Sequence, residues 1–238
     1  MSPPSEFSVE WFGLLSYANA LVLQEDAVRD RLAKRTQDRL LLLEHPPVVT
    51  LGRSTDPGNL RLGEQELHAA GIERFEVPRG GDVTYHAPGQ LVGYPILDLD
   101  ALGRRDVHAH LRNIEAGMID ALEEIGIPAT RIPGWTGVFV DRERSPLATG
   151  RERKIASIGV GVRRWVTFHG FALNVTIDLD GFKAIVPCGL KDVEMTSVDL
   201  ELAIQGSEPG ETALDLDLRV REVIGRSMRV HLASLAGE

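Results

Sequence analysis

The chain contains one cysteine, Cys188, within the run VPCGL at 186–190, where proline and glycine indicate a loop. A thiol with a pKa near ~8.5 is only a few per cent thiolate at neutral pH, so it needs a nearby cation or base to act as a nucleophile. Lys154, one of four lysines, lies 34 residues upstream at the head of the apolar run KIASIGVGV. If the fold brings the two together, they suffice for covalent acyl transfer.

Both residues also have ordinary structural interpretations. Lone cysteines are among the most often buried residues, and many are small apolar fillers of the core. Lys154 could be a surface lysine at the end of a strand. Because a spacing of 34 residues does not establish contact, both interpretations stay open at this point.

A glycine-rich segment, RGGDVTYHAPGQ at 79–90, lies between apolar stretches. Its adjacent glycines would let a ligand approach the backbone and would leave amide groups free to bind it. The alternative is a tight hairpin in which the glycines only satisfy backbone dihedral angles. The segment is not a Walker loop, because no Gly-Lys-Ser/Thr follows, and it does not match the dinucleotide-binding fingerprint.

The histidines predict no metal site. His108 and His110 are two residues apart on an expected helix, so they point to different faces. His45, His86 and His169 could meet in space. Without a second cysteine or an HExxH pattern, however, a zinc site is not expected there.

Composition excludes several classes of protein. The 238 residues are 43% hydrophobic, enough for a large core. A net charge of −9 argues against binding nucleic acid through its phosphates. A lone cysteine and an N-terminus without a basic, apolar leader favour the cytoplasm, and no apolar run approaches the roughly 18 residues that span a membrane.

Patterns in the first half of the chain predict alternating short elements. We expect a strand at 7–16 and a helix from Tyr17 to about Asp38. A buried strand pair follows at 39–53, broken at Pro46-Pro47, and then a short helix ended by Gly71. The stretch 75–99 is expected to form a strand, a glycine loop and a strand.

The second half begins with the clearest helix signal, from an Asp106 cap to Ile125, with Gly126 as its stop. Segments 131–141 and 154–165 are typical of a hairpin with a charged connection, followed by a strand at 166–177 and an amphipathic helix at 214–235. Since no regular βαβ rhythm appears, we expect an α/β (α+β) fold with mixed sheets, as a single main domain over 1–238 and a catalytic core at about 40–198.

Three motifs together resemble one known family. RGGDVTYHAPGQLVGYPILDL at 79–99, KIASIGVGVRRWVTFHGFALNV at 154–175 and PCGL at 187–190 have the order and spacing of the lipoyl(octanoyl) transferases of protein lipoylation. These belong to the biotin/lipoate protein ligase superfamily, whose fold has central mixed sheets flanked by helices. The likeness extends from Leu40 to about Val198.

The resemblance implies transfer of an octanoyl group from octanoyl-acyl carrier protein to a lysine ε-amine, as the first step of endogenous lipoate synthesis. The acceptors would be the lipoyl domains of 2-oxoacid dehydrogenase E2 subunits and the glycine cleavage H protein. The cysteine matching Cys188 carries the acyl thioester, and the lysine matching Lys154 lowers the pKa of the thiol and shuttles protons. No cofactor, metal, nucleic acid or membrane is implied.

The resemblance also implies the residues that line the acyl site, with His86 and His169 positioning substrate. Backbone amides near Gly189, or in the stretch 157–159, are candidates for binding the oxyanion. Ile155, Ile158, Val160, Leu91 and Val92 could line an acyl tunnel or simply fill the core. The lining residues implied are Arg79, Gly80, Gly81, Asp82, Val83, Thr84, Tyr85, His86, Ser157, Ile158, Gly159, Gly170, Phe171 and Ala172.

The chain departs from the family pattern at two places. Ala87 stands where the family usually has glycine, so a positive φ there would be strained. The charged insert between Val140 and Lys154 is longer than usual. Neither departure removes a group expected to be catalytic.

The expected partners are acidic, as is this chain, so docking should use a clustered positive face. Arg151, Arg153, Arg163 and Arg164 are the candidates. Three alternative functions remain: an ATP-dependent lipoate or biotin ligase that needs no cysteine, a cysteine-dependent amidotransferase between two proteins, and a non-catalytic acyl- or partner-binding protein.

Overall fold

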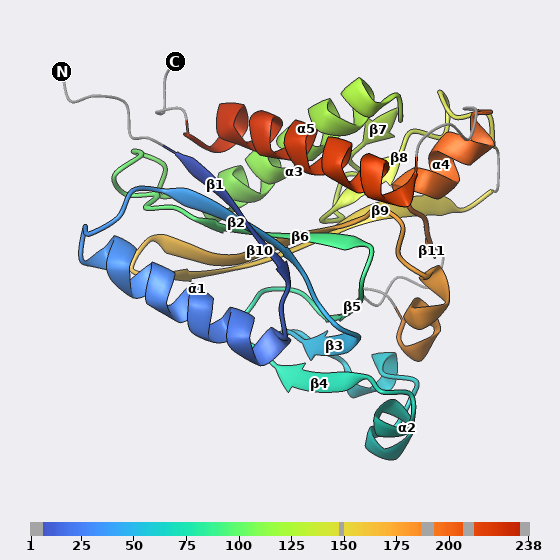
Figure 1. Ribbon diagram of the computed structural model, residues 1–238, viewed down its shortest axis with the longest axis horizontal. Coiled ribbons are helices and arrows are strands. Elements are labelled where there is room, and N and C mark those ends of the chain that lie inside the picture. Colours follow the sequence, from blue (N-terminus) through green and yellow to red (C-terminus); the bar gives the residue numbers. More distant parts are fainter. Residues whose placement is uncertain (1–6, 148–149, 187–192, 207–211, 234–238) are drawn as a thin grey trace.

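The computed structural model describes residues 7–147, 150–186, 193–206 and 212–233. Cys188 and its PCGL motif therefore lie outside the described residues, and the role expected of Cys188 remains a prediction. Within the described part, two β-sheets are surrounded by helices (Figure 1). This is the α/β architecture that the sequence predicts.

The larger sheet has eight described strands in the order β1-β2-β6-β10-β9-β8-β7, and β11 pairs with the start of β9. Pairings are mixed: β1–β2 and β11–β9 are parallel, whereas β2–β6, β6–β10, β10–β9 and β9–β8 are antiparallel. The strands are β1 (Ser8–Leu14), β2 (Arg39–Glu44), β6 (Gln90–Ile96), β7 (Ala129–Thr130), β8 (Val138–Val140), β9 (Glu152–Arg163), β10 (Val166–Asn174) and β11 (Val193–Met195).

The smaller sheet has the order β4-β3-β5, formed by β3 (Val48–Leu51), β4 (Glu73–Glu76) and β5 (Val83–His86). Strands β2 and β3 are neighbours in sequence but belong to different sheets. Pro46 and Pro47 separate them, since proline has no N–H with which to continue a ladder. The predicted break at these prolines is confirmed, and it is the point where the chain passes from one sheet to the other.

Helices cover both faces of the larger sheet (Figure 1). Helices α3 (Val107–Ile125) and α5 (Ala213–Ala233) pack together on one face, and α1 (Tyr17–Leu32) lies on the other. Met228 of α5 lies close above Gly117 of α3, where the helices approach each other. The shorter helices are α2 (Glu64–Ala69), α4 (Val198–Ile204), η1 (Pro57–Asn59) and η2 (Leu179–Ala184). No helix in the described ranges is long and apolar enough to cross a membrane.

The ends of α3 confirm the predicted caps. The Asp106 side chain accepts a hydrogen bond from the Ala109 amide, and Gly126 ends the helix with φ 101°. By contrast, α1 ends at Leu32, earlier than the predicted Asp38. Asp38 instead forms a buried ion pair with Arg31 (Nε–Oδ1 2.6 Å). Helical periodicity in the sequence does not reveal this pairing.

The strain considered at Ala87 is not present. The described non-glycine residues with positive φ are Lys34, Arg164, Trp165 and His169, so Ala87 keeps an ordinary backbone conformation. In this loop it is Gly89 that has a positive φ, of 84°. The alanine is buried in the small-sheet core, where its methyl group is accommodated.

Gly89→Ala should destabilise the protein more than Gly126→Ala. Both glycines have positive φ, which costs an L-residue about 1–2 kcal/mol. A Cβ at Gly89 would also lie 2.7 Å from the Ile177 backbone nitrogen, whereas none of the surrounding heavy atoms lies within 4 Å of a Cβ at Gly126. We expect an additional loss of about 1–3 kcal/mol for Gly89→Ala in urea unfolding. Equal losses for the two variants would contradict this packing.

Candidate active site

A cavity of about 230 Å³ lies where the small sheet meets the large one. Its walls come from the 79–84 segment and β5, from β6, β9 and β10, from the loop before β8, and from the start of α1. The two sheets thus share one pocket, and their mutual position determines its shape. Val92, Ile158, Phe171 and Ala172 supply apolar surface to it.

Two stretches expected at the site lie side by side in the ladder between β9 and β10. Ser157 pairs with Ala172, Ile158 with Phe171, and Gly159 with Gly170, and all six residues line the cavity. Of the apolar candidates for an acyl tunnel, Val92 and Ile158 line it. The others belong to the hydrophobic core: Leu91, Ile155 and Val160.

The glycine-rich segment contributes most of the opposite wall. Gly80 is turned toward β9, because its amide donates to the carbonyl of Val160 at 2.8 Å. Tyr85 packs edge-on against Phe182 in the small-sheet core. The expected residues of this segment that line the cavity are Arg79, Gly81, Asp82, Val83, Thr84 and His86.

Close contact between the sheets explains why glycines are needed here. A Cβ on Gly159 would lie 2.8 Å from the carbonyl oxygen of Gly80, and one on Gly52 would lie 2.3 Å from that of Gly81. Arg79 is buried and donates to the carbonyl and hydroxyl oxygens of Thr50 at 2.7 and 2.9 Å. The glycines therefore seat this segment between the sheets, and Gly81 also lines the cavity.

Lys154 is almost completely buried, with 1% of its surface exposed. Its Nζ donates to the Thr136 carbonyl at 3.1 Å and lies 5.6 Å from the centre of the Phe139 ring. Thr136 lines the cavity and Lys154 does not, so the ammonium lies behind the lining, against the Thr136 carbonyl. Gly137 makes room for this side chain, because a Cβ there would lie 2.7 Å from Lys154 Cε.

Three of the seven histidines gather at the other part of the site, with two tyrosines. His45 Nδ1 donates to the Leu15 carbonyl at 2.8 Å, so its Nε2 accepts from the Tyr94 hydroxyl at 2.7 Å. The rings of His45 and His86 are 5.7 Å apart, and Tyr17 stacks near both. Of the three histidines expected to meet, His45 and His86 lie next to each other. His169 is linked to His45 through the ring of Tyr94.

Burial keeps these side chains neutral. It lowers the pKa of His45 to about 4, and it lowers the pKa of His86 and of His169 to about 3, with the Arg79 charge acting in the same direction on the latter two. Burial likewise raises the pKa of Tyr17 to about 12 and that of Tyr94 well above its ordinary value. Among the described residues, no group of three or more His, Cys, Asp or Glu side chains is arranged to hold a metal ion.

The backbone of His169 is strained. Its φ of 54° is unusual for a residue other than glycine, and its amide is held by a 2.8 Å hydrogen bond to Gln24 Oε1 of α1. Such conformations cost roughly 1–3 kcal/mol and cluster at ligand-binding positions. His169 lines the cavity from within strand β10.

Sequence reasoning missed several residues of the cavity. Tyr17 and Tyr94 were unmarked, because a buried aromatic residue in a helix or strand has no sequence sign that separates a pocket from a core. Gly134, Trp135 and Thr136 form the remaining wall. Their motif PGWTG, an aromatic residue between glycines in a loop, is a signal that could have identified them.

The predicted docking face is wrong as a group. Arg153 is buried, with 4% of its side chain exposed, and forms an ion pair with Glu201. Arg163 pairs with Glu25 at 2.6 Å and lies at the opposite end of β9 from Lys154, about 30 Å away for nine extended residues. The four arginines do not form one exposed patch around Lys154, because alternate residues of a strand point to opposite faces and the strand itself is long.

Acid should destabilise the fold from about pH 6.5 downward. An unfolded histidine has a pKa of about 6.5, so between that pH and the lowered folded values the unfolded chain binds protons that the folded chain does not. Each buried histidine then contributes a slope of up to about 1.4 kcal/mol per pH unit. Urea unfolding at pH 7, 6 and 5 should show a shallower slope for His45→Gln. The exposed His108→Gln serves as the control; equal slopes for both variants would contradict the assignment.

Comparison with known proteins agrees with this geometry. The family described as the lipoyl protein ligase A/B catalytic domain matches residues 16–211. A protein of Solibacter usitatus named octanoyltransferase is 50% identical over 199 residues, covering 84% of this chain and 86% of the relative. An octanoyltransferase of Geobacter sulfurreducens is 47% identical over 187 residues, covering 79% and 72%.

Solved structures share the fold at low sequence identity. A bi-partite lipoate protein ligase from Thermoplasma acidophilum superposes with a TM-score of 0.63 at 17% identity, covering 96% of this chain and 84% of that one. Lipoate-protein ligase A bound with ATP gives 0.62 at 16% identity, covering 98% and 88%. These findings confirm the predicted fold class and the resemblance read from the three motifs, and with it the expected enzyme class, a transferase. The chain belongs to the lipoyl protein ligase A/B catalytic domain family.

Proposed function

We propose that this protein transfers an octanoyl group from octanoyl-acyl carrier protein to the ε-amine of a lysine on lipoyl domains, through a thioester on Cys188. The observation that carries the proposal is the buried Lys154 ammonium, which is bonded to the carbonyl of Thr136, a lining residue of a cavity with apolar surface. The octanoyltransferases among its relatives support the acyl group. The acceptors would be 2-oxoacid dehydrogenase E2 subunits and the glycine cleavage H protein.

In the first half-reaction, the Cys188 thiolate attacks the carbonyl carbon of the donor thioester. A carbon–sulfur bond forms to the enzyme, the bond to the carrier sulfur breaks, and the Lys154 ammonium donates a proton to the departing thiolate. The buried position of Lys154 strengthens this role, since a cation in a medium of low polarity interacts more strongly with a nearby thiolate.

In the second half-reaction, neutral Lys154 accepts a proton from the incoming lysine ammonium. The resulting amine attacks the enzyme thioester and releases its second proton to solvent as the amide forms, and Cys188 leaves as thiolate beside the re-formed ammonium. Exchange of one thioester for another is nearly balanced in energy, and conversion of a thioester to an amide is downhill. The cycle therefore needs no ATP. Backbone amides of the 157–159 stretch lie at the cavity wall and remain candidates for the oxyanion site.

Intact-protein mass spectrometry tests this route directly. After incubation with octanoyl-acyl carrier protein and no ATP, the wild type should gain one hydroxylamine-labile octanoyl group, and Cys188→Ser should gain none. Lys154→Met keeps the length of the side chain without its charge, and should form the adduct about 10²–10⁴-fold more slowly because the proton donor is lost. An adduct on Cys188→Ser would place the acyl group on another residue.

An ATP-dependent ligase is the other outcome of the same experiment. If lipoyl-domain modification required ATP and free octanoate, and survived Cys188→Ser, the proposed transfer from a carrier protein would be wrong. A protein that binds octanoyl carrier protein without forming an adduct would be a non-catalytic binding protein instead.

The space that Gly137 leaves for Lys154 gives a second test. Gly137→Ala would place a Cβ 2.7 Å from Lys154 Cε and 3.2 Å from its Nζ, so the ammonium must move. We expect acyl-enzyme formation to slow about tenfold or more, since small displacements of catalytic groups are costly. Gly71→Ala is the matched control: its φ is also positive, and none of the surrounding heavy atoms lies within 4 Å of its Cβ. Equal rates for the two variants would contradict the role given to Gly137.

A further inference from the structure

A series of buried hydrogen bonds leads from His86 at the cavity to Thr196, the residue that follows strand β11. His86 Nδ1 lies 2.7 Å from Gln90 Oε1, Gln90 Nε2 donates to Asn174 Oδ1 at 2.8 Å, and Asn174 Nδ2 donates to the Thr196 carbonyl at 2.9 Å. Gln90, Asn174 and Thr196 are each 1% exposed. Shielded from water, these groups depend on one another for their partners.

Which group donates and which accepts in each of these bonds follows from the last acceptor, the Thr196 carbonyl. A backbone carbonyl can only accept, so Asn174 must present its NH₂ to Thr196 and its oxygen to Gln90. Gln90 must then present its NH₂ to Asn174 and its oxygen to His86. His86 is therefore the tautomer with hydrogen on Nδ1, and Nε2 carries the lone pair.

His86 lines the cavity, and its Nε2 has no protein partner among the described residues. The ring therefore offers a bound substrate a hydrogen-bond acceptor and not a donor. Within the His86 segment, the Tyr85 carbonyl accepts a longer bond from Gln90 Nε2 at 3.3 Å, which favours the same orientation of the Gln90 amide. The shorter bonds run through Asn174 to the Thr196 carbonyl, which lies 110 residues later in the chain.

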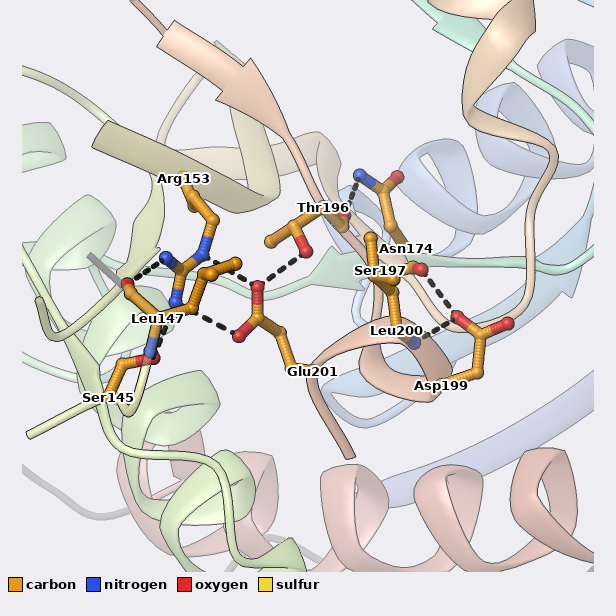
Figure 2. A network of polar contacts seen from close by, with 9 residues as sticks. All are labelled: Ser145, Leu147, Arg153, Asn174, Thr196, Ser197, Asp199, Leu200 and Glu201. Carbon is orange, nitrogen blue, oxygen red and sulfur yellow. Dashed lines mark hydrogen bonds and ion pairs between the residues drawn. The ribbon is translucent and has the colours of Figure 1, made fainter. Parts of the chain in front are cut away.

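Thr196 uses its other two polar groups as well. Its amide donates to the carbonyl of Lys154 at 3.0 Å, and its hydroxyl donates to Glu201 Oε1 at 2.6 Å. Glu201 is completely buried and is held by two bonds from Arg153, at 2.8 and 3.1 Å (Figure 2). Thr196 thus contacts the strand of Lys154, the relay to His86 and the ion pair of α4.

Arg153 extends the network to the charged insert. Its guanidinium donates to the Leu147 carbonyl at 2.7 Å and to the Ser145 hydroxyl at 2.6 Å, as Figure 2 shows. A buried ion pair stays rigid only when the remaining donors and acceptors are satisfied, and this one has four bonds on the guanidinium and three on the carboxylate. The charged insert therefore packs into the same network that holds Thr196.

We propose that Thr196 is a positioning residue for acyl transfer: its amide fixes the register of the Lys154 strand, its carbonyl selects the Nδ1–H tautomer of His86, and its hydroxyl anchors both to the Arg153–Glu201 pair. The inference rests on the proposed function for its effect on rate. Its effect on His86 does not depend on that function.

Imidazole ¹⁵N NMR tests the tautomer without any substrate. The wild type should show a protonated Nδ1 and an unprotonated Nε2 for His86. In Asn174→Leu, which breaks the relay between Gln90 and Thr196, the two nitrogens should give averaged or exchanged signals. A wild-type ring with hydrogen on Nε2, or an unchanged ring in Asn174→Leu, would overturn the inference.

Steady-state octanoylation kinetics test the effect on rate. Thr196→Val removes only the hydroxyl, and kcat should fall about tenfold with KM little changed, since the groups that bind the acyl chain stay in place. Thr196→Ser should restore the rate. Thr167→Val is the matched control. Thr167 is also completely buried, and its hydroxyl donates to the Pro95 carbonyl at 2.6 Å. It lies near the start of β10, whereas Asn174 of the relay is the last residue of that strand.

Equal kcat values for Thr196→Val and Thr167→Val would show that the Thr196 hydroxyl has only an ordinary structural role. If the wild type itself were not acylated, the proposed function would fail, and the tautomer measurement would still decide whether Thr196 controls His86.

Discussion

Backbone pairing on both edges of β9 holds the site together. At Lys154 the strand pairs with Phe139 of β8 on one side and Met195 of β11 on the other, and farther along it pairs with β10. These ladders bury a long cationic side chain whose solvation must be replaced by protein groups. With both edges of the strand covered, the Lys154 side chain is shielded from water, and its ammonium donates to the carbonyl of Thr136, which lines the cavity.

The same strand separates two chemically different environments. Lys154 and Arg153 are adjacent in sequence, so their side chains point to opposite faces. Lys154 bonds to Thr136, which lines the cavity, whereas Arg153 enters a fully paired ionic network with Glu201. The alternation of a strand is thus enough to place one cation beside the cavity lining and its neighbour in a structural ion pair. The sequence had instead suggested that Arg153 lies on an exposed docking face around Lys154.

Local features were predictable from the sequence where local physics decides them. The Asp106 cap and Gly126 stop of α3, the proline break at 46–47 and the hairpin before β9 are all confirmed, because caps, missing amides and alternation act over a few residues. Two of the three motifs of the resemblance, at 79–99 and 154–175, located most of the cavity lining. The PCGL motif lies outside the described residues, so the contact between Cys188 and Lys154 stays a prediction.

What could not be predicted depends on long-range partners. Burial of Arg153 requires Glu201, 48 residues away, and the end of α1 depends on the Arg31–Asp38 pair. Tyr17 and Tyr94 reach the cavity only because α1 and β6 meet at the junction of the two sheets. Spacing in one element carries no information about where another element will lie, and charged residues enter the interior only when the fold brings a counterion.

The junction of the sheets also links ligand binding to folding. The cavity wall is shared between β5 of the small sheet and β6, β9 and β10 of the large one, so an acyl chain within it would bury apolar surface from both. A bound acyl chain would act as additional hydrophobic core between the small and large sheets. Its binding free energy would then add to the free energy needed to separate the two sheets. Substrate binding and the stability of the fold would therefore be thermodynamically linked.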